Sequence, residues 1–205
     1  TSTTVYGSTC TEATNAVTPT VLVAASTFND ALGNDNTVSN TYTWTYDTAD
    51  PTMTITSTAG TADGGTSNVE AFALTFTSNE ATANFVVGDI TATGGSGCTL
   101  GSFSSTSTSV YTATCTPDNA GETVNVLVAA ATYTDTAGND NAVSNTFDWT
   151  YETTAPTMTI TSATVASGGT TATAAVVLVY TSSEATTDFA TGDITDTGCT
   201  DDSFT

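Results

Sequence analysis

The chain has 205 residues, with no Lys, Arg or His and 21 Asp plus Glu, so its formal net charge is −21. No ion pair between side chains can form, and every carboxylate must be solvated, hydrogen-bonded or neutralised by a bound cation. This composition argues against nucleic acid and anionic membrane surfaces as partners. The longest apolar stretches, residues 126–131 and 172–180, are too short for membrane insertion.

Alternation of large apolar residues with Thr dominates the chain and predicts an all-β fold. Examples are Thr52-Met53-Thr54-Ile55-Thr56 and Phe147-Asp148-Trp149-Thr150-Tyr151, in which the apolar side chains share one face. Turn signals rich in Gly, Asp and Pro separate such runs, as at Asp63-Gly64-Gly65. In chain order, the strands of the complete unit are predicted near residues 52–58, 69–78, 84–93, 99–104, 108–116, 122–133 and 143–151. About seven short strands in about 100 residues indicate a β-sandwich.

An internal repeat of about 105 residues organises the chain: Pro51 to Thr56 returns as Pro156 to Thr161, and Trp44 returns as Trp149. We therefore expect tandem beads of domain size. Residues 1–47 are predicted to be the C-terminal half of one bead, 48–152 a complete bead, and 153–205 the N-terminal half of another. Residue 205 followed by residue 1 would continue the repeat. We expect the chain to be a segment of a longer repetitive polypeptide.

Two cysteines recur at matching places of the repeat, which favours one disulfide per bead and an oxidising, extracellular compartment. Cys98 is expected to pair with Cys115, and Cys199 with Cys10 of the next copy. The short spacing suggests that the bridge staples neighbouring strands, or a loop to a strand, and it is worth about 3 kcal/mol on the chain-entropy model. The alternative is two reduced core cysteines. A zinc site is disfavoured by the lack of His and of CxxC spacing.

Several runs together resemble the bacterial-type immunoglobulin-like domains that occur in tandem in large surface proteins and adhesins. They are Thr77 to Thr82, Phe85 to Thr91, Tyr111 to Thr114 and Asp135 to Asn139, with a second copy beginning at Ser183 to Thr186. The resemblance implies an immunoglobulin-like β-sandwich on the cell surface, used as spacer, adhesin stalk or filament building block, without catalysis. The chain departs from the family in its disulfide and its lack of basic residues.

Acidic loops of the immunoglobulin-like topology provide a candidate calcium site, because two of them lie at the end where the chain enters the bead. Hard oxygen ligands from loops suit Ca²⁺. Calcium is the cofactor that these residues favour. The alternative is that Asp135 to Asn139 is a simple turn. The candidate ligands are Glu80, Asp135, Asn139 and Asp140 with the linker residues Asp47 and Asp50, and the matching acids elsewhere are Asp30, Asp35, Glu152 and Glu184.

Catalysis is not expected from this chain. Asp196-Thr197-Gly198 spells an aspartic-protease triplet, but the corresponding Ala92-Thr93-Gly94 lacks the Asp. No His or Lys is present to activate a Ser or Thr nucleophile.

The leading hypothesis is a structural protein, an extracellular filament of beads that contact copies of themselves, with O-glycans on exposed Thr and Ser. The second hypothesis is the stalk of an adhesin.

Overall fold

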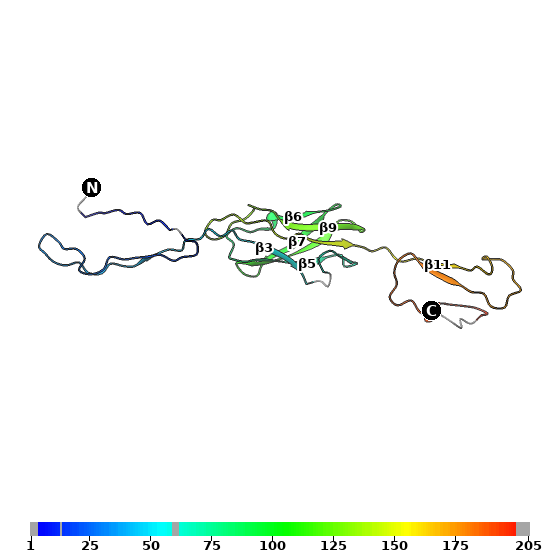
Figure 1. Ribbon diagram of the computed structural model, residues 1–205. Coiled ribbons are helices and arrows are strands. Elements are labelled where there is room, and N and C mark those ends of the chain that lie inside the picture. The colour runs from blue at the N-terminus through cyan, green and yellow to red at the C-terminus, as the bar shows by residue number, and fades with distance from the viewer. Residues whose placement is uncertain (1–3, 13, 59–61, 200–205) are drawn as a thin grey trace. The chain divides into compact units, whose positions relative to one another are not determined.

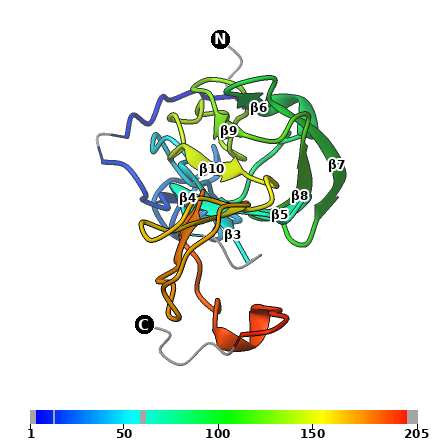
Figure 2. The ribbon, with the colours of Figure 1, turned by 90° about the vertical axis from the view of Figure 1, so that its right-hand side faces the viewer.

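The structure is a computed structural model that describes residues 4–12, 14–58 and 62–199. The chain divides into two compact units, one ending at Thr153 and the other beginning at Thr154. The first unit contains a complete two-sheet sandwich, and its two sheets appear on opposite sides of a common core in Figure 2. The all-β fold class is confirmed; short 3₁₀ turns, η1 (Val87–Asp89) and η2 (Thr191–Asp193), are the helical elements of the described residues.

One sheet of the sandwich has four antiparallel strands in the order β3-β5-β8-β7. Its edge strand β7 shifts register between Gly101 and Ser104, which marks a bulge. An irregularity of this kind bends an edge strand and makes it a poorer template for unwanted pairing. The strands are β3 (Met53–Ser57), β5 (Phe72–Ser78), β7 (Cys98–Ser105) and β8 (Val110–Pro117).

The second sheet has the order β4-β10-β9-β6, in which β4 runs parallel to β10 and the other pairs are antiparallel. The complete sandwich therefore has eight strands, one more than predicted, because the turn predicted from Asp63 is followed by a short strand that begins at Gly65. Both sheets are visible in Figure 1. The strands are β4 (Gly65–Ser67), β6 (Ile90–Thr93), β9 (Glu122–Val128) and β10 (Phe147–Tyr151).

Three predicted strands are shorter in the structure by four residues or more. The strand predicted at 84–93 begins only at Ile90, because Asp89 Oδ2 accepts the Val86 N–H at 2.8 Å and closes the 3₁₀ turn before it. The strand predicted at 122–133 ends at Val128, and the one predicted at 143–151 begins at Phe147. The residues between them form a long loop that is held by side-chain amides.

Alternation along the strands produces the core. In β3, β5 and β8 every second residue is buried and the intervening Thr and Ala residues are more exposed. Trp149 is fully buried, and its ring lies on Phe72 of the opposite sheet at a centroid distance of 4.6 Å. The buried apolar residues are Met53, Ile55, Phe72, Leu74, Phe76, Phe85, Ile90, Tyr111, Ala113, Cys115, Val124, Val126, Val128, Tyr133, Phe147 and Trp149.

Two strand pairs lie outside the sandwich. In the first unit, β1 (Thr20–Val21) pairs with β2 (Tyr42–Thr43). In the second unit, β11 (Met158–Thr161) pairs with β12 (Val179–Ser182). Both pairs are antiparallel and largely exposed.

Candidate functional site

Three carboxylates meet where the chain enters the sandwich. Asp47 lies in the linker before β3, Glu80 in the loop after β5, and Asp135 in the long loop between β9 and β10. One carboxylate oxygen from each lies within 4.8 Å of the other two. Because the chain has no basic residue, no side chain with a positive charge can balance the group. We call Asp47, Glu80 and Asp135 the carboxylate junction.

A tight turn holds Asp135 in place. Its Oδ1 accepts the backbone N–H groups of Ala137, Gly138 and Asn139 at 2.7–2.9 Å, and Gly138 has the positive φ of +97° that such a turn favours. Burial raises the pKa of Asp135, but the hydrogen bonds from Asn139, Gly138 and Ala137 outweigh it and lower the pKa overall. Asp135 is therefore ionised and oriented inside the loop.

Asn139 connects this turn to the linker. Its Nδ2 donates to Asp135 Oδ2 at 2.8 Å and to the backbone oxygen of Asp47 at 3.2 Å. The amide nitrogen thus acts as a donor within the junction and fixes Asp47 beside Asp135. Asn139 was predicted as a ligand, and in the structure this nitrogen positions two of the carboxylates.

Glu80 is the carboxylate of the junction whose pKa is raised by its surroundings. Its pKa is raised, first by desolvation and then by the negative charges of Asp47 and Asp135, with a smaller contribution from Asp50. A hydrogen bond with Asn79 partly opposes this rise. Like charges in a partly desolvated group favour either a proton or a bound cation. Because the pKa of Glu80 is raised and that of Asp135 is lowered, Glu80 gains a proton before Asp135 as pH falls.

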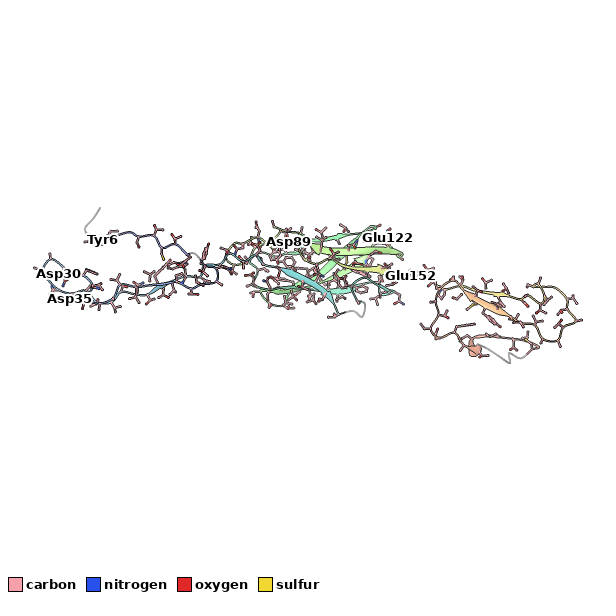
Figure 3. The ribbon with its side chains drawn as sticks, in the orientation of Figure 1. Tyr6, Asp30, Asp35, Asp89, Glu122 and Glu152 are labelled. Carbon is pink, nitrogen blue, oxygen red and sulfur yellow. A yellow bond between two sulfur atoms is a disulfide. The ribbon has the colours of Figure 1, made fainter. Side chains whose placement is uncertain are left out.

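The other predicted ligands lie outside this group. Asp50 acts on Glu80 by charge alone, and Asp140 is exposed and pairs with Thr134 at the base of the Asp135 turn. Asp30 repeats the Asp135 turn: it accepts the N–H groups of Leu32 and Asn34 at 2.9 and 2.8 Å. The Asn34 side chain and backbone lower the pKa of Asp30. Asp30 and Asp35 lie close together at a loop tip, whereas Glu122 and Glu152 share the end of the sandwich where the chain leaves it (Figure 3).

Asp35 and Glu184 complete the set of predicted acids. Asp35 accepts a hydrogen bond from Asn29 in the same loop as Asp30. Glu184 follows β12, where its backbone N–H donates to Ser182 Oγ at 3.4 Å. Neither joins a group of three carboxylates within the part of the chain that the structure describes.

Asn141 and Asn145, which the sequence reasoning overlooked, hold the long loop between β9 and β10 that contains Asp135. The buried Asn141 accepts the N–H groups of Thr132 and Tyr133 through Oδ1 and donates to the carbonyls of Ala129 and Ala142 through Nδ2. Asn145 forms a similar pair of hydrogen bonds with the backbone of Ile55. The recurrence of Asn36 in the place of Asn141 was the available signal, because each copy needs an amide that both accepts and donates.

The cysteines occupy two different states. Cys98 of β7 and Cys115 of β8 form a disulfide with a Cα–Cα distance of 5.6 Å. Cys115 faces Leu100 in the ladder, so the bridge runs diagonally between neighbouring strands of one sheet. Cys10 and Cys199 are free and exposed in the structure.

A family model for the bacterial Ig-like domain matches residues 47–151, just over half of the chain. No curated protein and no solved structure shows a significant match. Among the described residues, no helix has the length and apolar character needed to cross a membrane.

Proposed function

The chain belongs to the bacterial Ig-like domain family, and from this premise we propose that it is a non-catalytic building block of an extracellular filament or surface appendage. The observation that carries the proposal is the repeat in the sequence: Pro51 to Thr56 returns as Pro156 to Thr161 and Trp44 returns as Trp149, so the repeats follow one another in a fixed order. An end-to-end series of such beads is the simplest use of this order.

The disulfide, the negative charge and the exposed hydroxyl groups agree with an extracellular setting. The disulfide suits an oxidising compartment, and the high negative charge disfavours anionic partners. Exposed Thr and Ser residues provide acceptors for O-glycans, which are part of the proposal and can be detected by mass spectrometry of the native material.

The alternative is the stalk of a cell-surface adhesin, in which the beads extend a separate binding domain away from the cell. The same fold serves either role, because a fold does not determine a function. Lateral contacts between beads distinguish the two: a filament needs them in an ordered helical arrangement, whereas a stalk is a single thread.

Electron microscopy of the native material tests the proposal. We expect ordered filaments with an axial step of roughly 35–45 Å per bead, the length of strands of up to 8 residues with their turns and a linker. Single flexible threads that end in a distinct head would instead establish the adhesin stalk. Dispersed molecules without filaments or threads would contradict both.

We further propose that the carboxylate junction binds Ca²⁺ and stiffens the entry to the sandwich. Three carboxylates from two loops and a linker converge there without a compensating positive side chain. Ca²⁺ accepts 6–8 oxygen ligands in flexible geometry, which suits donors from separate loops. The turn around Asp135 remains as a structural element in either case, since its backbone hydrogen bonds do not depend on a cation.

Adding Ca²⁺ should raise the melting temperature of the wild-type chain, because a ligand that binds only the folded state stabilises it by about 2.7 kcal/mol at 100 times its Kd. Glu80→Gln should abolish this rise. Glu70→Gln, which removes one charge from an exposed residue at the other end of β5 from Glu80, should preserve it. Calorimetry with Ca²⁺ and with Mg²⁺ measures the effect.

Without Ca²⁺, Glu80→Gln should be more stable than wild type at neutral pH, since it removes a charge repelled by Asp47 and Asp135. The folded-state pKa of Glu80 is raised, so the wild type gains stability as pH falls through that pKa. The difference in free energy of unfolding between Glu80→Gln and wild type therefore narrows. Equal responses of Glu80→Gln and Glu70→Gln to Ca²⁺ would contradict the proposed site.

A further inference from the structure

The hydroxyl group of Tyr133 is buried at the end of the sandwich that carries the carboxylate junction. Tyr133 is 1% exposed, and its hydroxyl oxygen has no hydrogen-bond partner within the part of the chain that the structure describes. A buried polar group without a partner costs free energy, and native proteins retain few such groups. The Tyr133 hydroxyl therefore needs a partner that the described residues do not supply.

The hydroxyl faces the carboxylates of the junction. Tyr133 and Asp135 are both buried and lie on either side of Thr134, whose backbone is extended and bridged to Asp140, so their side chains share one side of the loop. Burial raises the pKa of Tyr133, the Ser78 side chain lowers it, and the negative charge of Glu80 raises it further. Glu80 is therefore close enough for its charge to act on the hydroxyl.

The groups around the hydroxyl are polar as well. Ser78 is 4% exposed, and its Oγ accepts the Glu80 N–H at 3.5 Å but does not form a hydrogen bond with Tyr133. The hydroxyl of Tyr111 pairs with the buried Thr82 Oγ1 at 2.5 Å. A buried site with several polar groups suits an ordered water molecule, which forms 2–4 hydrogen bonds.

The carboxylate junction offers fewer oxygen atoms than Ca²⁺ takes, which is about 6–8. Both oxygens of Asp135 are already engaged, since Oδ1 accepts three backbone N–H groups and Oδ2 accepts the Asn139 amide. If Asp135 contributes one oxygen and Asp47 and Glu80 two each, the junction supplies about five. Water completes the coordination of such an ion, and a water on its inner side needs a partner in the protein.

We propose that the Tyr133 hydroxyl accepts a hydrogen bond from a water ligand of the Ca²⁺ ion in the carboxylate junction. A water that binds a cation through its oxygen has two hydrogens to donate. The hydroxyl accepts one of them and donates its own hydrogen to Ser78 Oγ, so its hydrogen bonds are satisfied. Tyr133 thus acts as a positioning residue that contacts the ion only through water. The inference rests on the proposed Ca²⁺ site and adds a residue to it.

The repeat of the chain shows that the hydroxyl is separable from the fold of the loop. Phe28 occupies the place of Tyr133 in the other copy of this loop. Asn36 Oδ1 accepts the Phe28 N–H at 3.0 Å, as Asn141 Oδ1 accepts that of Tyr133 at 2.9 Å. The same backbone hydrogen bond therefore forms with either aromatic residue. Tyr133→Phe removes the hydroxyl and keeps the ring that packs against Phe85 at 5.2 Å.

The test measures Ca²⁺ binding to the purified chain by isothermal titration calorimetry, in salt that screens weak binding to exposed carboxylates. Tyr133→Phe should weaken Ca²⁺ binding about 10–100-fold, the usual effect of removing a group that orients a metal ligand. Tyr151→Phe is the matched control and should bind Ca²⁺ like wild type. Tyr151 pairs with Glu122 at the start of β9, whereas the loop that contains Tyr133 follows the end of that strand.

Melting temperatures in a chelator separate a role in ligand binding from a role in the fold. Tyr133→Phe should melt no lower than wild type, because its hydroxyl has no protein partner to lose. Tyr111→Phe should melt lower, because the Tyr111 hydroxyl pairs with Thr82 and donates to the Thr108 carbonyl at 3.3 Å. Differential scanning calorimetry gives both values.

A spectroscopic signal reports on the hydroxyl itself. The near-ultraviolet absorption of a buried tyrosine shifts when its hydroxyl gains a hydrogen bond. Addition of Ca²⁺ should therefore produce a tyrosine difference spectrum in wild type and in Tyr151→Phe. Tyr133→Phe should lose this shift even at Ca²⁺ concentrations that saturate its weaker site. A purely structural role of Tyr133 would not produce the signal.

Wild-type Ca²⁺ affinity in Tyr133→Phe, or an undiminished difference spectrum in that variant, would overturn the inference and leave the Ca²⁺ site of the junction in place. A melting temperature of Tyr133→Phe as low as that of Tyr111→Phe in chelator would also overturn it, because the hydroxyl would then serve the fold. If wild type does not bind Ca²⁺, the proposed site and the inference fail together. The filament role is decided separately by electron microscopy.

Discussion

Replacing Trp149 with Ala should lower the free energy of unfolding of the sandwich by about 3–5 kcal/mol, the usual cost of truncating a buried aromatic residue. Trp149 is fully buried between the sheets, with Phe72 at 4.6 Å and Phe147 at 6.0 Å between ring centroids. Since small domains have a total stability of about 5–15 kcal/mol, the loss is a large fraction of the whole. Urea denaturation followed by far-UV circular dichroism measures it.

Trp44 provides the matched control, because it occupies the same place in the repeat as Trp149. Trp44 is only partly buried, and its ring contacts that of Tyr42. Trp44→Ala should therefore lower the free energy of unfolding much less than Trp149→Ala does. Equal losses of stability from the two substitutions would show that Trp44 is packed as tightly as Trp149. Such a result would contradict the contrast in burial between the two residues.

Removal of the Cys98–Cys115 disulfide should lower stability by about 3 kcal/mol, the chain-entropy value for a loop of this length. The bridge closes a separation of 17 residues and joins β7, an edge strand, to β8. For a domain of about 100 residues, the loss corresponds to a fall in melting temperature of roughly 12–24 °C. The double variant Cys98→Ala with Cys115→Ala suits the test, since Ala remains compatible with the buried site of Cys115.

Differential scanning calorimetry of dilute, monomeric protein measures this fall. The control is the double variant Cys10→Ala with Cys199→Ala, whose thiols are free and exposed in the structure. Its melting temperature should match that of wild type. A reducing agent should lower the melting temperature of the control but not that of the Cys98 and Cys115 variant. An unchanged melting temperature after loss of Cys98 and Cys115 would refute the stabilising role of the bridge.

The two large effects concern the same sandwich but act on different states of the chain. Loss of Trp149 weakens the packing of the folded state, whereas loss of the disulfide mainly enlarges the conformational freedom of the unfolded state. Phe72 packs on Trp149 and pairs with Cys115 in the ladder, so the two sites share a neighbour and their contributions should couple in a combined variant. Such a variant has little stability left and tests the lower limit at which the bead still folds.

Local chemistry made several features predictable from the sequence. Alternation of Thr with Met53 and Ile55, or with Phe72 and Leu74, determines which face of a strand is buried, because side chains point to opposite sides of the sheet at each step. The turn at Asp135 was also predictable, since a carboxylate followed by Gly and Asn captures nearby backbone N–H groups. All-β structure and a staple between neighbouring strands follow from such patterns.

The composition alone shows that no basic side chain can balance carboxylates that lie close together, because the chain has none and its net charge is −21. It did not reveal which carboxylates meet. Asp47, Glu80 and Asp135 were predicted together with Asp50 and Asp140, and only the packed loops separate the first three from the other two. That selection depends on how two sheets and a linker come together over long sequence separations, and no local pattern encodes it.

Tertiary structure likewise decided the details that break the alternation. The parallel pairing of β4 with β10 and the hydrogen bonds between Asn145 and the backbone of Ile55 depend on partners distant in sequence. The sequence by itself determined the strand faces, the repeat and the paired cysteines, because these arise from local spacing. The packing of one sheet on the other determined the buried core and the carboxylate junction, because burial requires partners that local spacing cannot supply.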